Sequence, residues 1–255
     1  MPTVVTPGAY SAAAPRIAPV TGDDPWSVYD AMAPAFEAHA ADGAYNAHYD
    51  RPSVLDLVGD VRGLRVLDAA CGPGLYLEEL LQRRAVVSAF DASEEMIALA
   101  RRRVADESTR ILRAVLGESL PFDEAAFDLV LCALAIHYVH DRAETFRELF
   151  RVLRPGGALV VSTQHPTTDW LRKGGSYFDV RQEEDHWVRD GVTYPVVFWR
   201  EPLTSLCAAI TDAGFLIERL VEPLPAESMR DLYPEEWEEL HHRPGFLALR
   251  LVRPG

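Results

Sequence analysis

The 255-residue chain lacks the features that mark membrane, secreted and nucleic-acid-binding proteins. No run approaches the ~18 apolar residues that a membrane-spanning helix needs. The net charge of −14 argues against a nucleic acid or an anionic membrane as partner, because both attract basic surfaces. Only three cysteines are present, without a CxxC pair, so we expect no disulfide framework and a reducing, cytoplasmic location.

Metal-binding patterns and targeting signals are also missing from the sequence. No HxxxH or HxH pair stands beside an acid on one predicted element, so we expect no bound metal. Residues 1–22 are rich in Pro, Ala, Thr and Gly, but they lack the basic start and apolar centre of a secretory signal. We predict that they form a disordered tail and that residues 23–255 form a single domain.

The sequence shows a regular alternation of short apolar runs, typical of buried strands, with segments typical of helices. We predict strands at residues 65–68, 86–90, 111–115, 127–133, 158–162, 215–221 and 246–252. Helices are predicted at 51–58, 75–83, 94–105, 142–153 and 202–213, the fourth stopped by Pro155-Gly156-Gly157. The alternation predicts an α/β fold with a doubly wound, Rossmann-like, seven-stranded sheet. Because no long helix separates the last two strands, the final strand should run antiparallel in a mostly parallel sheet.

Two flanking segments depart from this alternation. Residues 24–50 are predicted to form a helical lid broken by Pro34 and Gly43. Residues 164–200 form a polar insertion rich in Trp and Tyr. Because such side chains suit an apolar pocket with a few polar contacts, we interpret the insertion as the wall of a substrate pocket. An aromatic or heteroaromatic metabolite, for example an indole or a phenol, is the predicted occupant.

One strand–turn–helix–strand segment predicts a cofactor site. Asp68 and Asp91 stand at the two strand ends, and Gly72 and Gly74 lie in the turn. Ligands bind at the carboxyl ends of parallel strands, so the layout suits an adenosine-containing cofactor. An acid at the start of the turn opposes the pyrophosphate of a dinucleotide, and Pro73 removes a backbone N–H that phosphate could use. The turn favours S-adenosylmethionine, which carries an ammonium, a carboxylate, a sulfonium and a ribose, over the alternative of a nicotinamide dehydrogenase.

Four motifs sharpen this interpretation. In chain order they are V-L-D-A-A-C-G-P-G, F-D-A-S-E-E-M-I-A-L-A-R, L-P-F-D-E-A-A-F-D-L-V and L-R-P-G-G-A-L-V-V-S. Their order and spacing resemble the class I S-adenosylmethionine-dependent methyltransferases, and most of all the small-molecule branch that includes the quinone-biosynthesis (type 11 domain) methyltransferases. The resemblance covers about residues 51 to 165 and extends only loosely to the flanks.

The resemblance implies which residues bind the cofactor. Asp68 and the turn hold the methionine end, and Asp91 takes the ribose hydroxyls. Many relatives carry an Asp at the position of Leu116 to bind the adenine amino group, so here Glu118 or backbone contacts must replace it. The full implied set is Asp68, Ala70, Gly72, Gly74, Asp91, Ala92, Met96, Gly117, Glu118 and Ala133. From the lid we add Tyr29, Tyr49 and Arg51, with Arg51 placed to pair with the cofactor carboxylate.

Two histidines are the candidate catalytic residues. His137 follows the strand at 127–133 and His165 follows the strand at 158–162, so both are expected at the ligand edge of the sheet. Either could accept a proton from the methyl acceptor or orient it, with capping or packing as the alternative role. His39, His48 and His186 rank lower, whereas His140, His241 and His242 are interpreted as surface residues.

We therefore predict an enzyme that transfers a methyl group from S-adenosylmethionine to a C, N or O atom of a small, aromatic molecule and leaves S-adenosylhomocysteine. Such a transfer depends mainly on positioning and desolvation of the reactants. The alternative is a repurposed methyltransferase fold that acts as a binding protein or a cyclase. A small-molecule substrate is the expected partner, and the sequence is compatible with a monomer or a homodimer.

Overall fold

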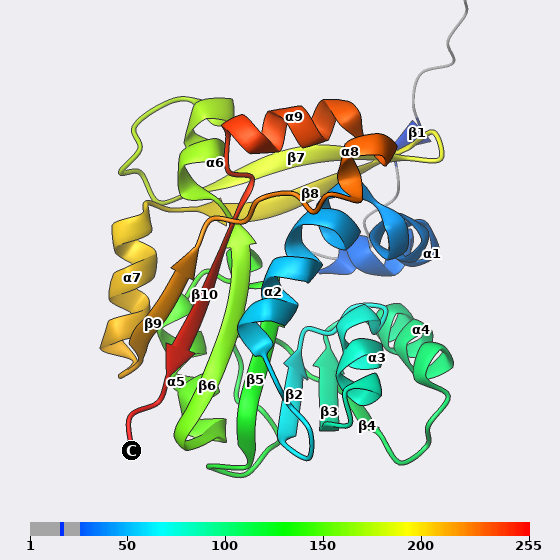
Figure 1. Cartoon of the computed structure of the whole chain (residues 1–255). Helices are drawn as coiled ribbons and strands as arrows, with labels where there is room; N and C mark the ends of the chain where they lie inside the picture. Colours follow the sequence, from blue (N-terminus) through cyan, green and yellow to red (C-terminus); the bar gives the residue numbers. More distant parts are fainter. Residues whose placement is uncertain (1–15, 18–25) are drawn as a thin grey trace, which may run out of the picture.

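The computed structural model describes residues 16–17 and 26–255, and a seven-stranded sheet forms its centre (Figure 1). The strands are β2 (Arg65–Ala69), β3 (Val86–Asp91), β4 (Arg110–Arg113), β5 (Phe127–Ala133), β6 (Leu153–Gln164), β9 (Leu216–Val221) and β10 (Phe246–Val252). Their order in the sheet is β4-β3-β2-β5-β6-β10-β9. The first five pair in parallel, and β10 is antiparallel to both β6 and β9. The predicted doubly wound sheet with an antiparallel last strand is confirmed.

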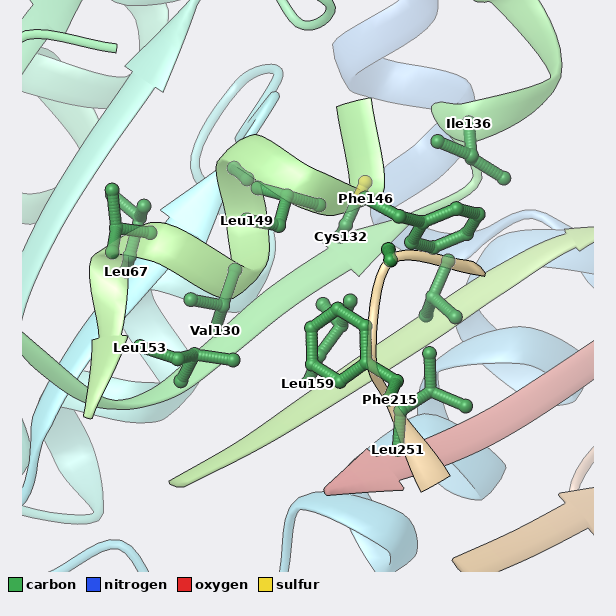
Figure 2. Packing of buried hydrophobic residues seen from close by; sticks show 14 of the residues in the cluster. Leu67, Val130, Cys132, Ile136, Phe146, Leu149, Leu153, Leu159, Phe215 and Leu251 are labelled. Atoms are coloured by element: carbon green, nitrogen blue, oxygen red, sulfur yellow. The ribbon is translucent and has the colours of Figure 1, made fainter. Parts of the chain in front are cut away.

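Helices cover both faces of the sheet. Successive side chains of a strand point to opposite faces, so each strand contributes residues to both buried clusters. On one face, Leu67, Val130 and Leu159 join a cluster with Phe146 and Leu149 of α5 (Arg142–Val152), while α7 (Leu203–Asp212) adds further residues (Figure 2). The opposite face is covered by three helices, namely α2 (Arg51–Val58), α3 (Leu75–Gln82) and α4 (Glu94–Val104). This double burial explains why the strands read as continuous apolar runs in the sequence.

Two predictions about helix ends are wrong. Pro34 does not break the lid, because α1 (Ser27–Asp42) runs through it and ends at Gly43. The burial of Met32 and its neighbours offsets the hydrogen bond that a proline removes. Helix α5 ends at Val152, so Pro155-Gly156-Gly157 lies inside β6 instead of stopping the helix. The pairing of β6 with β5 shifts register there, and this irregularity accommodates the missing N–H of the proline.

A second layer lies across the carboxyl ends of β2, β5 and β6 (Figure 1). It consists of α1, the π-helix η1 (Asn46–Asp50), α6 (Pro166–Lys173), the antiparallel hairpin of β7 (Arg181–Arg189) and β8 (Val192–Arg200), α8 (Met229–Leu232) and α9 (Pro234–His242). The predicted insertion at 164–200 is thus a helix followed by a hairpin. Of the predicted tail, only β1 (Arg16–Ile17), which pairs in parallel with β8, lies within the described residues.

Candidate active site

A cavity of about 430 Å³ separates the carboxyl ends of β2, β3 and β5 from the covering layer. Its volume falls in the range of small-molecule sites. Most of the predicted cofactor residues line it: Tyr29, Arg51, Asp68, Ala70, Gly72, Asp91, Ala92, Met96, Gly117, Glu118 and Ala133. The structure therefore brings the motif residues and part of the lid around one space.

Asp68 supplies a buried carboxylate at the bottom of this cavity. Its side chain is 2% exposed, and its Oδ2 atom has no hydrogen-bond partner among the described residues. Burial, together with the nearby charge of Asp91, raises the pKa of Asp68 to about 7. A carboxylate in this state gains free energy from a cationic partner, which would pair with the free oxygen and lower the pKa.

Asp91 at the end of β3 is held in one orientation by backbone donors. The N–H of Gly72 donates to its Oδ2 at 2.8 Å, and the N–H of Ser93 donates to its Oδ1 at 2.9 Å. The Ser93 hydroxyl accepts from the N–H of Met96 and so caps α4, while it donates to Asp30 of the lid helix. The remaining lone pairs of Asp91 are available to hydroxyl donors.

Arg51 and Asp50 form a charged corner of the cavity, and sequence analysis missed the second of these. The guanidinium of Arg51 donates to the carbonyl of Ala40 at 2.7 Å, but its buried Nε has no partner among the described residues. The hydroxyl of Tyr76 on α3 donates to Asp50 Oδ2 at 2.6 Å. Burial raises the pKa of Asp50 to about 6. The only signal in the sequence was the position of Asp50 directly before Arg51.

At the other end of the cavity, the loop after β4 contributes to the lining. Leu116, Gly117 and Glu118 all line it, opposite Ala92 and Met96 at the end of β3 and the start of α4. Glu118 is exposed, whereas Met96 is buried. These residues bound a mainly apolar part of the cavity next to Asp91, which we call the slot.

Three comparisons with known proteins agree with this geometry. A family model described as a methyltransferase domain matches residues 67–161. The demethylmenaquinone methyltransferase of Lactococcus lactis is 32% identical over 46% of this chain and 49% of its own length. A solved S-adenosylmethionine-dependent methyltransferase from Mesorhizobium loti is 30% identical over 79% of this chain and 96% of its own, with a TM-score of 0.63. The chain is a class I S-adenosylmethionine-dependent methyltransferase. The donor of the methyl group is therefore S-adenosylmethionine, and not the nicotinamide cofactor kept as an alternative above.

Other similarities of this methyltransferase are informative in fold alone. The [4+2]-cyclase SpnF is 19% identical over 94% of this chain and 98% of its own, with a TM-score of 0.65. The chain spans about half the length of the Lactococcus enzyme.

None of the helices in the described part of the chain is long and apolar enough to cross a membrane. Across residues 16–17 and 26–255, no cluster of His, Cys, Asp and Glu side chains could hold a metal ion.

Two predicted cofactor residues, Tyr49 and Gly74, lie outside the cavity lining and contact neighbouring elements instead. The hydroxyl of Tyr49 accepts from the N–H of Gly245 at 2.8 Å, which joins the π-helix to the start of β10. Gly74 begins α3 with φ at +83°, and a Cβ there would meet Ala100 of α4 at 3.0 Å. Gly74 thus allows close packing of α3 on α4 beneath the turn.

The two candidate catalytic histidines also lie outside the cavity lining. His137 is turned inward by the short helix η2 (Ile136–Tyr138) and packs against Phe198, with Nδ1 3.3 Å from the Thr163 hydroxyl. Burial, and then the charge of Arg142, lowers its pKa to about 3. His165 caps α6 through the N–H of Thr167, and its Nε2 lies 3.1 Å from Glu222. Both histidines thus have the capping and packing contacts that we considered as their alternative role.

Aromatic side chains form the wall of the cavity that faces the covering layer. The hydroxyls of Tyr29 on α1 and Tyr138 on η2 are 2.5 Å apart. His140 is exposed, as the sequence predicted, and it also lines the cavity and lies against Trp199, with 4.2 Å between the ring centroids. Among the predicted aromatic residues of the insertion, Trp199 is the one that reaches the cavity.

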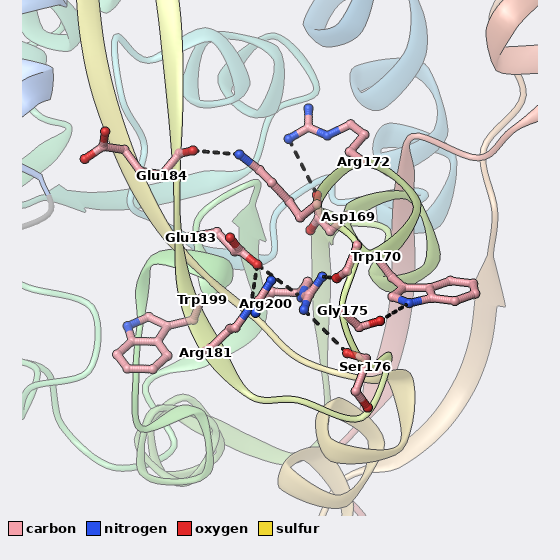
Figure 3. Close-up of polar contacts among 12 residues, drawn as sticks. Asp169, Trp170, Arg172, Gly175, Ser176, Arg181, Glu183, Glu184, Trp199 and Arg200 are labelled. Atoms are coloured by element: carbon pink, nitrogen blue, oxygen red, sulfur yellow. Dashed lines mark hydrogen bonds and ion pairs between the residues drawn. The ribbon is translucent and has the colours of Figure 1, made fainter.

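Buried arginines hold Trp199 in place. Arg142 at the start of α5 donates to the carbonyl of Trp199 at 2.7 Å and to that of Ile136, and it pairs with Glu201. The adjacent Arg200 points the other way, donates to the carbonyl of Gly174 at 2.7 Å and ties β8 to the end of α6 (Figure 3). The two arginines therefore fix Trp199 on the side of β8 that faces the loop after β5.

Proposed function

We propose that this methyltransferase transfers the methyl group to a small aromatic or heteroaromatic molecule. The observation that carries the proposal is the set of aromatic side chains that line the same cavity as the donor residues, namely Trp26, Tyr29, Phe36, Tyr138 and Trp199. Aromatic rings stack well on such walls, and the hydroxyls and His140 supply a few polar contacts. A C, N or O atom of the acceptor would then lie at the end of β5.

The residues at the sheet edge fit the chemistry of the methyl donor. The free Oδ2 of Asp68 suits an ammonium group, and the free Nε of Arg51 suits a carboxylate. Asp91, held by Gly72 and Ser93, suits the two hydroxyls of a ribose. The slot between Met96 and Gly117 suits the adenine, with packing and backbone contacts replacing the Asp that many relatives carry at the position of Leu116.

The donor supplies a methyl carbon bonded to a positively charged sulfur, which is a good leaving group. The task of the protein is then to align the acceptor with that bond and to exclude water. Burial raises the pKa values of Tyr29 and Tyr138 well above 10, so both hydroxyls remain protonated. One of the two donates to the other, which leaves one hydroxyl proton for a hydrogen bond to the acceptor. Because His137 and His165 lie outside the cavity lining, we propose His140 as the side chain that receives an acceptor proton when one must leave.

A product assay tests this proposal. Phenols, indoles and related heteroaromatic compounds would be incubated with the enzyme and methyl-labelled S-adenosylmethionine, and labelled product and S-adenosylhomocysteine would be measured together. The proposal predicts both in equal amounts with at least one aromatic acceptor. Label on aliphatic acceptors alone would contradict the aromatic assignment. Tight donor binding without any S-adenosylhomocysteine would instead favour the binding protein or cyclase alternative.

A further inference from the structure

Two buried carboxylates and one half-buried guanidinium line the methionine end of the cavity, and within the described residues no ion pair joins them. The side chains of Asp50 and Asp68 are 1% and 2% exposed, and each has one carboxylate oxygen without a hydrogen-bond partner among the described residues. Arg51 is the one Lys or Arg among the described residues that line the cavity, and its guanidinium donates to the carbonyls of Ala40 and Ala41. Buried carboxylates without a paired cation are costly, so this arrangement indicates a cationic ligand.

Asp50 is held in a fixed orientation in this corner. Tyr76 donates to its Oδ2 at 2.6 Å, and burial together with the charge of Asp50 raises the pKa of Tyr76 well above 10, so the hydroxyl remains a donor. The Arg51 guanidinium carbon lies 5.9 Å from the centre of the Tyr76 ring. The second oxygen of Asp50, Oδ1, is therefore free and belongs to a residue that lines the cavity.

The charges of the donor outnumber the partners assigned so far. S-adenosylmethionine carries an ammonium, a carboxylate and a sulfonium, whereas Asp68 and Arg51 account for the first two. We propose that Asp50, oriented by Tyr76, is the counter-charge of the sulfonium, so that the site binds the charged donor more tightly than the uncharged demethylated product. This inference rests on the assignment of Asp68 and Arg51 made under the proposed function.

The proposed role has a direct consequence for turnover. When an electron pair of the acceptor atom forms a bond to the methyl carbon, the S–CH3 bond breaks, its electron pair stays on sulfur and the sulfur becomes neutral. Asp50 then loses its partner while the ammonium and carboxylate keep theirs. The loss of this one interaction would weaken binding of the product relative to the donor and favour its release.

Calorimetric titration tests the proposal without any methyl acceptor. Dissociation constants of S-adenosylmethionine and S-adenosylhomocysteine would be measured at pH 7.5 for the wild type, Asp50→Asn and the control Asp56→Asn. Asp56 is an exposed acid of α2, the helix that follows Asp50, so its replacement removes the same charge from outside the cavity. We expect Asp50→Asn to weaken donor binding about tenfold or more and product binding less than about twofold, and the control to change neither. Equal losses for both ligands, or no loss for either, would overturn the proposal.

A second variant covers the case in which Asp50→Asn does not fold. Tyr76→Phe removes one hydroxyl and leaves Asp50 with Ser162 and Arg51 as nearby groups that lower its pKa, and Asp68 as the nearby acid. Its Asp50 should therefore take up a proton more readily, so the preference for donor over product should fall at pH 6.5 and recover at pH 8.5. A preference equal to that of the wild type at both pH values would overturn the proposal. Because these titrations need no acceptor, they remain interpretable even if every product assay fails.

Discussion

The two ends of the cavity are built in different ways. The donor end comes mainly from one strand–turn–helix–strand segment, in which Asp68, Gly72 and Asp91 stand within a few residues of strand ends. The acceptor end is assembled from α1, the loop after β5 and the end of β8, which lie far apart in the chain. The donor end is therefore polar and fixed by backbone contacts, whereas the acceptor end depends on tertiary packing of aromatic side chains. Variants that change donor affinity and acceptor use separately test whether the two ends act independently.

The largest effect is expected for Asp91→Ala at the donor end. The substitution removes the carboxylate that we assign to the ribose and also the acceptor that orders Gly72 and Ser93. Two hydrogen bonds to a charged group account for a loss of roughly 100-fold or more in donor affinity. Calorimetry would measure the dissociation constant, with replacement of the exposed Glu95 at the start of the following helix α4, Glu95→Ala, as control. An unchanged value for Asp91→Ala would contradict the ribose assignment.

The next effect concerns pH and again belongs to the donor end. Burial raises the pKa of Asp68 to about 7 and that of Asp50 to about 6, so both are partly protonated in mildly acidic solution. Donor affinity should rise about tenfold between pH 6 and pH 8 as the carboxylates ionise.

The contribution of these carboxyl groups to the stability of the free protein should fall as pH rises, whereas donor affinity should increase. A carboxyl group whose folded pKa lies above its unfolded value binds its proton more tightly in the folded state, so its contribution to stability is lost as pH rises through the folded pKa. Buried histidines such as His137, whose pKa is lowered, act in the opposite direction below about pH 6.5, so the test compares the wild type with Asp68→Asn. From pH 5.5 to pH 8 the melting temperature of the wild type should fall relative to that of Asp68→Asn. A difference between the two proteins that does not change with pH would contradict the raised pKa of Asp68.

A smaller effect is expected for Trp199→Ala at the acceptor end. The substitution removes the ring that lies against His140, so kcat/KM for the acceptor should fall about tenfold or more, while the donor dissociation constant should stay within about threefold. Trp170→Ala is the matched control, since Trp170 belongs to the same insertion but does not line the cavity. If Trp199→Ala weakened donor binding as strongly as acceptor use, the two ends would not be separate.

The contrast also explains how far the sequence could predict the site. Asp68 and Asp91 were predictable because parallel strands place their carboxyl ends at one edge, and the glycine turn marks which edge binds the cofactor. The contact between Asp50 and Tyr76 joins two helices, η1 and α3, through a buried side chain, and no local pattern in the sequence predicts it. In the same way, the hairpin β7–β8 decides which residues after β5 face the cavity, because Phe198 covers His137 and Trp199 meets His140.

The smallest effect on turnover is expected for His137→Gln. This variant tests whether His140, and not His137, receives a proton from the acceptor. His137 lies outside the cavity lining, and burial lowers its pKa to about 3, so it stays neutral wherever the enzyme is assayed. Glutamine can still reach the Thr163 hydroxyl, so kcat should change by less than about threefold, with a melting temperature a few degrees lower because the packing against Phe198 is imperfect. His140→Gln should lower kcat more for acceptors that must lose a proton and hardly at all for acceptors that need not. A large loss of turnover in His137→Gln at an unchanged melting temperature would instead return the catalytic role to His137, and the acceptor would then have to approach from beneath the aromatic wall.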